Sequence, residues 1–428
     1  MKEGTKIYKL AEKIFPYNRS LTGPGNVLTL LELKKIFKGL KIKKIKSTTK
    51  VFDRKVPLEW NVKKAKILET NGKVIIDYKK NNLHLISYSW PVNKIVSFKE
   101  LKKHLFYIKK MPTAIPYRTT YYNKNWGFCL SYNQFKTLKK KKYKIEIKSS
   151  FKKGFMHYGE VLIKGKSKKE ILLSTNICHP SLANNELSGP TVLIHIAKFI
   201  KKLSKRRFSY RIIFLPETIG SIAYLKNNYK EIKKFFFTGF NCVCLGDEKN
   251  FSFLPSRNEN SNSNFFAKES LSFFKKNFKQ YTWLDRGSDE RQYCSPGIDL
   301  DVASLMKSKY GTYKEYHTSL DNLDKFVTKK GLDQGFNLVK KTITLIENDY
   351  YPKSKTLCEP FMSKKNIYPK TGGGTRPIHI IQFMNLISYA DGLTPLSKIA
   401  KINKMSFKKC LEIFKYLKKK SLITFELE

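Results

Sequence analysis

Four side chains of the sequence are of the types that bind a metal ion or transfer a proton. Each follows an apolar stretch that predicts a buried strand: His179 after 170–178, Glu217 after 211–216, Asp247 after 242–246 and His317 after 301–306. The carboxyl ends of parallel strands meet at one edge of a sheet, where ligands bind. We therefore expect these four side chains to converge, although they are far apart in the sequence.

Two imidazoles and two carboxylates form a set suited to Zn²⁺, which takes nitrogen and oxygen ligands and keeps a position for water in catalytic sites. Bound zinc lowers the pKa of that water to roughly 7, and a nearby carboxylate can then accept its proton. Each of the four residues taken singly could instead be a helix cap, a loop hydrogen bond or part of a salt bridge. Together they favour a metal site.

The elements that must position these residues alternate between strands and helices from residue 116 to residue 357. We expect strands at 143–149, 159–164, 170–178, 210–216, 241–246 and 301–306, and helices at 188–203, 219–229 and 328–348. This order is typical of an α/β fold with a mainly parallel sheet flanked by helices. The catalytic domain is expected to comprise residues 1–50 and 116–357.

Residues 1–50 begin with a helical pattern of apolar residues at 7, 10, 11 and 14, followed by a Pro- and Gly-containing break and a second helix at 28–40. Arg19, Ser20 and Thr22 in this break could bind a carboxylate or phosphate, or form a turn and a helix cap. Residues 51–115 are predicted to form a small β-rich insert. The insert contains a hairpin at 65–78 with an Asn71-Gly72 turn, a strand at 83–88 and a helix at 97–105.

The C-terminal residues 358–428 contain a linker with Gly372–Gly374, helical segments at 380–389, 395–402 and 406–418, and a short strand at 422–425. This pattern predicts a winged helix-turn-helix domain. Its Lys-rich helix could enter a DNA groove, or the domain could be a protein–protein interaction module.

The composition of the 428 residues, 41% of them hydrophobic, is ample for about two or three packed domains. No apolar window approaches the ~18 residues of a membrane-spanning helix, and the N-terminus has no apolar signal core. The seven Cys are odd in number and lie mostly among apolar neighbours, so we expect buried thiols in a reducing compartment. Cys242 and Cys244 are predicted to face the same side of one strand. We expect a cytoplasmic protein without a structural zinc site.

The net charge of +50 could indicate binding to nucleic acid or to an anionic membrane. The excess is mostly Lys, however, and it is spread over the whole length together with abundant Asn, Ile, Phe and Tyr. These residue types share A/T-rich codons, so a biased genome explains the charge more simply. The charge therefore does not define a function.

The motifs in combination resemble those of the co-catalytic zinc aminopeptidase superfamily. The resemblance rests on His179 with Ala183-Asn-Asn-Glu-Leu-Ser-Gly189, and on Pro216-Glu-Thr-Ile-Gly-Ser221, Gly246-Asp247 and Tyr316-His-Thr318. The chain more closely resembles bacterial aminopeptidase-like proteins that are often encoded with surface-polysaccharide biosynthesis genes and that have a β-rich insert and a C-terminal winged helix. Segments 18–25, 125–129 and 285–291 also look like that family.

The resemblance implies that His179, Asp247 and His317 are zinc ligands and that Glu217 is the general base or a further ligand. The chain departs from the superfamily at three places. Asn185 stands where an aspartate would bridge two zinc ions, although Glu186 beside it could replace that acid. Glu217 stands alone, after Pro216, where a pair of glutamates is usual. Ser181 replaces the aspartate that would orient His179. These departures favour one zinc ion over two, and a non-catalytic site remains an alternative.

Asp289 aligns with a Ser-Asp motif near the substrate pocket of the superfamily. With Asp285, Arg286 and Arg291 it could hold the amine and carboxylate of a substrate, or these residues could form a structural salt-bridge cluster. Arg19 is a further candidate for substrate binding.

We expect a zinc-dependent hydrolase that cleaves an amide or peptide bond of a small substrate by metal-activated water. One alternative is an amidohydrolase acting on an amino sugar or another surface-polysaccharide precursor. Another is a non-catalytic regulatory protein whose winged helix contacts nucleic acid. Self-association into a homo-oligomer is also open.

Overall fold

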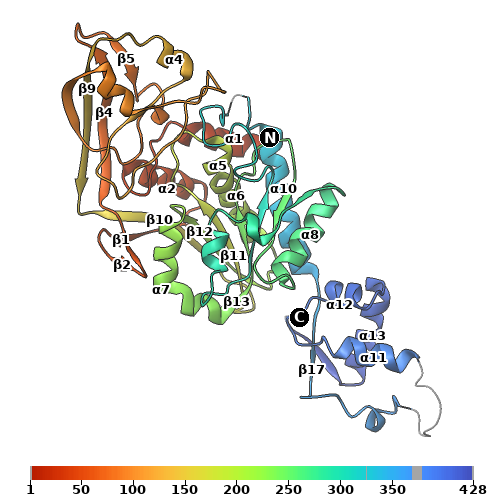
Figure 1. Ribbon diagram of the computed structural model, residues 1–428. Coiled ribbons are helices and arrows are strands. Elements are labelled where there is room, and N and C mark those ends of the chain that lie inside the picture. The colour runs from red at the N-terminus through yellow and green to blue at the C-terminus, as the bar shows by residue number, and fades with distance from the viewer. Residues whose placement is uncertain (1, 324, 369–377, 427–428) are drawn as a thin grey trace.

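The centre of the molecule is an eight-stranded sheet, seen in a computed structural model that describes residues 2–323, 325–368 and 378–426 (Figure 1). The strand order is β1 (Lys41–Lys46), β10 (Phe155–Ile163), β12 (Ser209–Leu215), β11 (Glu170–Asn176), β13 (Phe236–Cys242), β16 (Val302–Met306), β14 (Ser252–Leu254) and β15 (Lys279–Gln280). The strands β12, β11, β13 and β16 are parallel, and β1 and β10 pair antiparallel with their neighbours. Strand β14 is antiparallel to β16 and parallel to β15. The α/β architecture with a parallel centre is confirmed.

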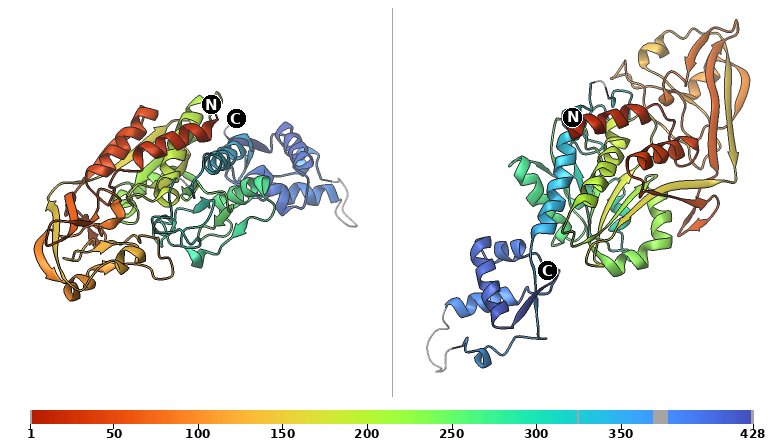
Figure 2. Two further views of the ribbon diagram at one scale, coloured as in Figure 1. Left: turned by 90° about the horizontal axis from the view of Figure 1, so that it is seen from above. Right: turned by 180° about the vertical axis from the view of Figure 1, so that it is seen from behind.

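Helices cover both faces of this sheet (Figure 2). One apolar core includes side chains of α1 (Glu3–Ile14), α2 (Pro24–Ile36), α6 (Ser188–Lys202), α8 (Asn262–Phe274) and α10 (Lys329–Asn348). A second core includes side chains of α7 (Ile219–Phe235) and α9 (Glu290–Tyr293) and continues into the insert. Every residue of β11 is buried, as expected of a parallel strand covered on both faces. The candidate residues that follow the carboxyl end of β11 are therefore attached to a rigid strand.

The insert is built on a four-stranded antiparallel sheet in the order β5 (Val74–Asp77), β4 (Glu59–Glu69), β9 (Lys142–Lys152) and β6 (Val92–Ser97). The predicted hairpin is present as β4 and β5. Strand β9, which we expected in the α/β domain, pairs with β4 and β6 instead, so the sheet of the insert includes residues well beyond 115. The strand expected at 83–88 is wrong, because this segment holds the 3₁₀ turn η1 (Asn82–His84) and isolated bridges.

The remaining elements of the first 140 residues are short. They are β2 (Lys50–Val51), β3 (Arg54–Lys55), α3 (Phe98–Lys103), β7 (Leu105–Phe106), β8 (Phe128–Cys129) and α4 (Tyr132–Lys136). They connect the insert to the segment from Ile115 to Tyr122, which lies beside the candidate site.

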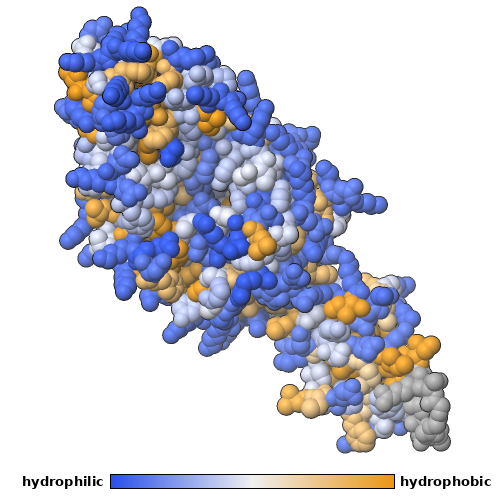
Figure 3. Space-filling view, in the orientation of Figure 1, coloured by the Kyte–Doolittle hydropathy of each residue, from blue (hydrophilic) through white to orange (hydrophobic). Residues whose placement is uncertain are grey.

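The C-terminal unit contains α11 (Ile378–Ile387), α12 (Leu396–Ile402) and α13 (Phe407–Lys419), with β17 (Tyr351–Ser354) paired to β18 (Ile423–Glu426). It has its own apolar core and projects from the body of the molecule (Figure 3). The amide nitrogen of Asn262 on α8 donates to the Leu393 carbonyl across the junction, at 3.0 Å. This arrangement confirms the winged helix. The linker residues Gly372–Gly374 lie outside the described residues.

Strand β13 ends at Cys242, whereas we expected the strand to run from 241 to 246. Cys244 adopts a left-handed backbone conformation with φ of 51°, so the expectation that the Cys242 and Cys244 thiols share a strand face is wrong. All seven cysteines are free, and only Cys358 is exposed. Among the described residues, no helix has the length and apolarity needed to cross a membrane.

Candidate active site

His179 is the third residue after the end of β11, and its exposed fraction is 5%. Its Nδ1 contacts Oε1 of Glu186 on the short helix α5 (Ala183–Glu186). The other carboxylate oxygen of Glu186 accepts hydrogen bonds from the backbone nitrogens of Cys178 (2.7 Å) and His179 (3.2 Å). Glu186 therefore orients His179 in place of the aspartate that Ser181 replaces. With Nδ1 so engaged, Nε2 is the nitrogen left for a ligand.

Glu217 follows β12 and faces His179, with 3.9 Å between Glu217 Oε2 and His179 Nε2. Its other oxygen, Oε1, accepts a hydrogen bond from the Ser288 hydroxyl at 2.7 Å. Burial raises the pKa of Glu217 above its usual value, although positive charge on His179 opposes this rise. For His179, burial would lower the pKa, but the carboxylates of Glu186 and Glu217 outweigh it and raise the pKa. The two groups thus form a mutually dependent acid–base pair.

His317 lies on the loop after β16, where its own φ is 54°. Its ring stacks on Tyr316, with 3.8 Å between the ring centroids, and its centroid is 5.1 Å from that of His179. His317 Nε2 is buried and has no hydrogen-bond partner. Burial and the positive His179 lower the pKa of His317 to about 3, so the imidazole is neutral, as a metal ligand must be.

Asp247 is fully buried, and its carboxylate is saturated with hydrogen bonds. It accepts from the Ser308 backbone (2.9 Å) and hydroxyl (2.8 Å), the Lys249 backbone (2.9 Å) and the Asn184 amide (3.1 Å). The Asn184 carbonyl in turn accepts from the Gly246 backbone at 2.8 Å. Asp247 thus ties the loop after β13 to the His179 loop, and a metal would have to compete for oxygens that are already bonded.

Asn185 lies beside this network, with its amide nitrogen 3.2 Å from Glu186 Oε1. Its amide oxygen is buried and unpartnered. The backbone nitrogens of Asn184 and Asn185 donate to the carboxylate of Asp321 at 2.6 and 3.1 Å. Burial raises the pKa of Asp321 to about 7.

The candidates for substrate binding lie outside this cluster. Arg19 is fully buried beneath the His179 loop and donates to the carbonyls of His179 (3.1 Å) and Ile14 (2.7 Å). Asp289 accepts hydrogen bonds from the Thr218 backbone and the Ser221 hydroxyl, and burial raises its pKa to about 8. Arg291 donates to the Thr218 hydroxyl at 2.7 Å. Together Asp289 and Arg291 support the segment that carries Glu217.

The other two candidates of this group are on the surface. Asp285 caps the 3₁₀ turn η2 (Trp283–Asp285) by accepting from Thr282, and Arg286 lies over the Trp283 ring, with its guanidinium carbon 5.1 Å from the ring centroid. Both residues are exposed.

A cavity of about 400 Å³ opens beside His179, Glu217 and His317. Its other walls include Tyr117, Arg118, Tyr121 and Tyr122 of the segment after the insert, Arg54 of β3 and the Cys178 thiol. The Tyr117 ring presents its edge or face to both imidazoles, with centroids 4.5 Å from His179 and 5.2 Å from His317. A second cavity of about 450 Å³ also reaches Tyr117, Arg118 and His317.

The segment from Ile115 to Tyr122, which forms part of the cavity wall, is joined by backbone hydrogen bonds to the loop that carries His317. The Tyr117 backbone donates to the His317 carbonyl at 2.8 Å, and the Ser319 backbone donates to the Ile115 carbonyl at 2.9 Å. Arg54, Arg118 and these tyrosines belong to no motif that could be recognised in the sequence. The Pro116-Tyr-Arg-Thr-Thr-Tyr-Tyr122 run, rich in aromatic side chains and placed between the insert and the first central strand, was the available signal.

The residues present fit a metal ion. The neutral His317 Nε2 and the Asn185 oxygen are buried without partners, and His179 Nε2 faces a carboxylate oxygen too distant for a hydrogen bond. Nitrogen and oxygen donors of this kind suit Zn²⁺. Among the described residues, the group whose ligand atoms all lie within 4.8 Å of one another is Cys178, His179 and Glu186, without Glu217 or His317. Burial and the neighbouring Glu186 raise the pKa of Cys178, so its sulfur is a thiol.

Comparison with known proteins gives matches over nearly the whole chain. A model described as a domain of unknown function, DUF4910, matches residues 8–349, and a winged helix-turn-helix model matches residues 349–425. A Clostridium acetobutylicum protein, named for polysaccharide biosynthesis with an aminopeptidase-like domain, is 40% identical over 408 residues, which are 95% of this chain and 93% of that protein.

Solved structures agree with this picture. A C. acetobutylicum structure described as a peptidase superposes with a TM-score of 0.83 at 37% identity and covers 99% of this chain and 96% of that one. BSAP, a zinc aminopeptidase from Bacillus subtilis, superposes with a TM-score of 0.58 at 15% identity, over 81% of this chain and 94% of that one. The latter likeness concerns the fold.

Proposed function

We propose that this chain, which belongs to the DUF4910 family, is a zinc-dependent hydrolase of the aminopeptidase fold that cleaves an amide or peptide bond. The observation that carries the proposal is the convergence of His179, Glu217 and His317 on one cavity, with His317 Nε2 buried and free to bind. These residues come from three loops that follow separate strands, so chance proximity along the chain does not explain their meeting.

Nε2 of His179 and Nε2 of His317 are the nitrogen ligands in this proposal. A carboxylate oxygen of Asp247, after loss of one of its hydrogen bonds, completes the set, and Glu217 Oε2 is kept for the proton. Asn185 offers a neutral oxygen where a second metal would need an acid, which supports a single zinc ion. A zinc ion, when bound, supplies the Lewis acidity that polarises a carbonyl and acidifies water.

Glu217 is the group placed to move a proton. The Ser288 hydroxyl holds its Oε1, so Oε2 is directed toward His179 and the cavity. Burial raises its pKa, which makes the carboxylate a better proton acceptor at neutral pH. Tyr117 and Tyr121 line the same cavity, and their rings lower the local polarity, which strengthens the electrostatic interactions within it.

Zinc analysis of the purified full-length protein, paired with hydrolysis of aminoacyl amides and N-acylated amino sugars, tests this function. We expect about one zinc per chain, loss of hydrolysis after chelation and recovery when zinc is returned. His317→Ala should lose the zinc. His379→Ala, at an exposed position of α11, is the matched control and should retain both zinc and activity. A wild-type protein that takes up no zinc contradicts the proposal.

The amino-sugar arm of that panel represents a second candidate substrate. It is favoured by the C. acetobutylicum relative that is named for polysaccharide biosynthesis. Hydrolysis of an N-acyl amino sugar with no cleavage of aminoacyl amides would assign the site to this class. The reverse result would assign it to peptides. The buried free thiols support a reducing, cytoplasmic setting for either reaction.

A further inference from the structure

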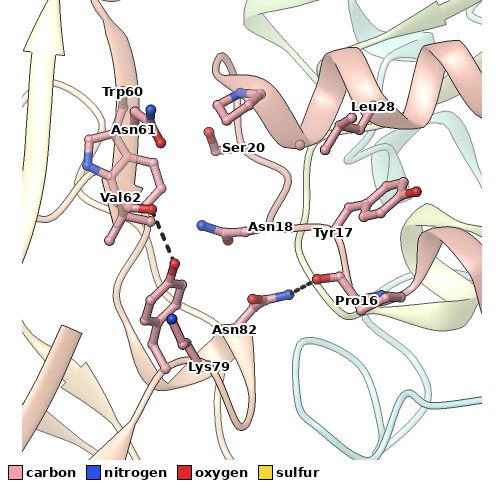
Figure 4. A pocket seen from close by; sticks show the side chains of 13 residues that line it. Pro16, Tyr17, Asn18, Ser20, Leu28, Trp60, Asn61, Val62, Lys79 and Asn82 are labelled. Carbon is pink, nitrogen blue, oxygen red and sulfur yellow. Dashed lines mark hydrogen bonds between the residues drawn. The ribbon is translucent and has the colours of Figure 1, made fainter. Parts of the chain in front are cut away.

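A third cavity, of about 450 Å³ and distinct from the two that reach His317, lies between the N-terminal loop and the insert (Figure 4). The loop contributes Asn18, Ser20 and the start of α2. The insert contributes Trp60–Val62 of β4 together with Tyr78, Lys79 and Asn82. Its volume is within the roughly 300–1,000 Å³ typical of small-molecule sites. None of its lining residues lines the cavity beside His179.

Unused amide groups face this cavity. The side-chain amides of Asn18 and Asn61 point into it (Figure 4), and neither has a hydrogen-bond partner among the described residues, although both residues are half-buried. The Asn82 nitrogen donates to the Pro16 carbonyl and the Ser181 hydroxyl, both at 3.0 Å, which leaves its oxygen available. An amide offers a donor and an acceptor side by side, as a ligand hydroxyl group requires.

Tyr78 and Val62 contribute to the apolar part of the wall, whereas the Trp60 side chain is 3% exposed and stacks on Tyr88, with 5.5 Å between the ring centroids. The Tyr78 hydroxyl donates to the Val62 carbonyl at 3.1 Å, and the Trp60 indole donates to the Ser89 carbonyl at 3.1 Å. Tyr17 also lines the cavity on the loop side, but its ring extends away from Trp60 and Tyr78 (Figure 4). The Tyr78 ring, fixed next to amide groups, suits the alternating apolar and hydroxylated faces of a sugar ring.

The charge of the cavity is positive. Lys79 is the charged side chain in the lining, and within the described ranges no carboxylate lines the cavity or pairs with the Lys79 ammonium. A ligand that carries one negative charge would therefore complete the site.

An extended peptide does not fit, because the open edge of β4 is already used here. The Trp60 backbone nitrogen donates to the Thr22 hydroxyl at 3.0 Å, and the Val62 carbonyl accepts from Tyr78. Gly23, with φ of 96°, packs so closely that a Cβ there would lie 2.4 Å from the Trp60 carbonyl oxygen. Peptides that add a strand need these backbone groups free.

We propose that this cavity binds an acidic sugar, a hydroxylated ring carrying one carboxylate or phosphate, with Asn18, Asn61 and Asn82 contacting its hydroxyl groups and Lys79 its anionic group. The same loop reaches the catalytic region, because Arg19, between Asn18 and Ser20, donates to the His179 carbonyl. The cavity is thus a carbohydrate site next to the hydrolytic one, and it does not depend on the hydrolytic function.

Calorimetric titration of the full-length protein with glucuronate, glucose 1-phosphate, glucose and citrate tests the site. We expect the acidic sugars to bind more tightly than glucose, and the better of the two identifies the carboxylate or the phosphate as the anionic group. Asn18→Ala and Asn61→Ala should each weaken binding about tenfold, the loss expected for roughly one hydrogen bond. Lys79→Gln should remove the preference over glucose, whereas Lys80→Gln, an exposed neighbour outside the lining, should not.

Three results would overturn the proposal: no binding of either acidic sugar, citrate binding as tightly as they do, or unchanged binding in both asparagine variants. Circular dichroism melting of each variant separates loss of binding from loss of folding. The zinc-free His317→Ala variant should bind the sugar as the wild type does. A failure of the metal centre and a failure of this site are therefore distinguishable.

Discussion

The two ends of strand β11 each carry a buried cluster of charged side chains, and the clusters differ in how completely they are paired. At the amino end, Arg211 of β12 contacts Glu170 through Nε (2.7 Å) and Glu160 through Nη1 (2.7 Å). Tyr224 donates to Glu160 at 2.7 Å, and Lys43 also pairs with it. At the carboxyl end, His179 and His317 come together with Glu186 and Glu217, and no Lys or Arg forms an ion pair with these carboxylates among the described residues.

The difference distinguishes a cluster that is completed by its own ion pairs from the one that we propose binds a metal ion. Around Arg211 each buried carboxylate has a cation, so the cluster is electrostatically complete. Around His179 a buried imidazole nitrogen and an amide oxygen are left without partners, and the pKa of Glu217 is raised by burial. Proteins normally satisfy buried polar groups, so unsatisfied ones that meet at a cavity indicate a missing ligand.

The largest expected effect is on catalysis. Glu217→Gln keeps the size of the side chain and its contact with Ser288 but removes the proton acceptor. We expect kcat to fall about 10²–10⁴-fold while zinc content is retained, because this is the usual contribution of a general base. Steady-state kinetics with parallel metal analysis checks it. An unchanged kcat in a zinc-loaded variant would show that Glu217 is not the base.

The next effect is on stability at the opposite end of β11. Arg211→Met leaves Glu170 buried without its cation and Glu160 with Lys43 alone, which we expect to lower the free energy of unfolding by about 3–5 kcal/mol. Urea denaturation measures this loss. Glu231→Gln, which removes the exposed carboxylate that also contacts Arg211, is the control and should change stability by less than about 1 kcal/mol.

A smaller effect is expected from the group that orients His179. Glu186→Gln removes the carboxylate next to Nδ1, and zinc affinity should fall about 10–100-fold, as is typical for such supporting groups. Competition with a chelator of known affinity measures the change. Equal affinity in the variant and the wild type would mean that the backbone alone orients the imidazole.

The smallest effect is the loss of stability at low pH that the Arg211 cluster causes. Burial would raise the pKa of Glu160, but hydrogen bonds from Lys43, Tyr224 and Arg211 outweigh it and hold the pKa below 4.5. A lowered pKa in the folded state means that the stabilisation is present above pH 4.5 and is lost as the pH falls through the folded-state pKa. Denaturation at a series of pH values should show this decline, and Glu160→Gln should flatten it.

Much of the fold was predictable because periodicity reports burial. The helix at 188–203 and the strands at 170–178 and 210–216 match α6, β11 and β12 within two residues. The pairing of strands was harder to predict, because the residue pattern of a strand does not show which strand it pairs with. For that reason β9 was placed with the central sheet, although its partners are β4 and β6. Segment 83–88 is apolar because its side chains are buried in apolar clusters, although its backbone is irregular.

The residue types of the candidate site were predictable from the sequence, but the role of each residue was less so. Strand ends identified His179, Glu217 and Asp247, and the structure places the first two at one cavity. The hydrogen bonds that saturate Asp247 come from Ser308 and Asn184, residues distant in sequence that carry no motif. The orienting role of Glu186 depends on the turn of α5, which brings it back against His179.

The backbone bonds between the cavity wall and the His317 loop have a kinetic consequence. Tyr117 and His317 are joined through main-chain atoms, so swinging the wall outward would displace an imidazole of the reaction centre. A hinged cover that opens for each turnover is therefore incompatible with an intact centre. We expect substrate to enter through a permanently open mouth and association to be a single exponential phase, with a rate proportional to substrate concentration and no plateau.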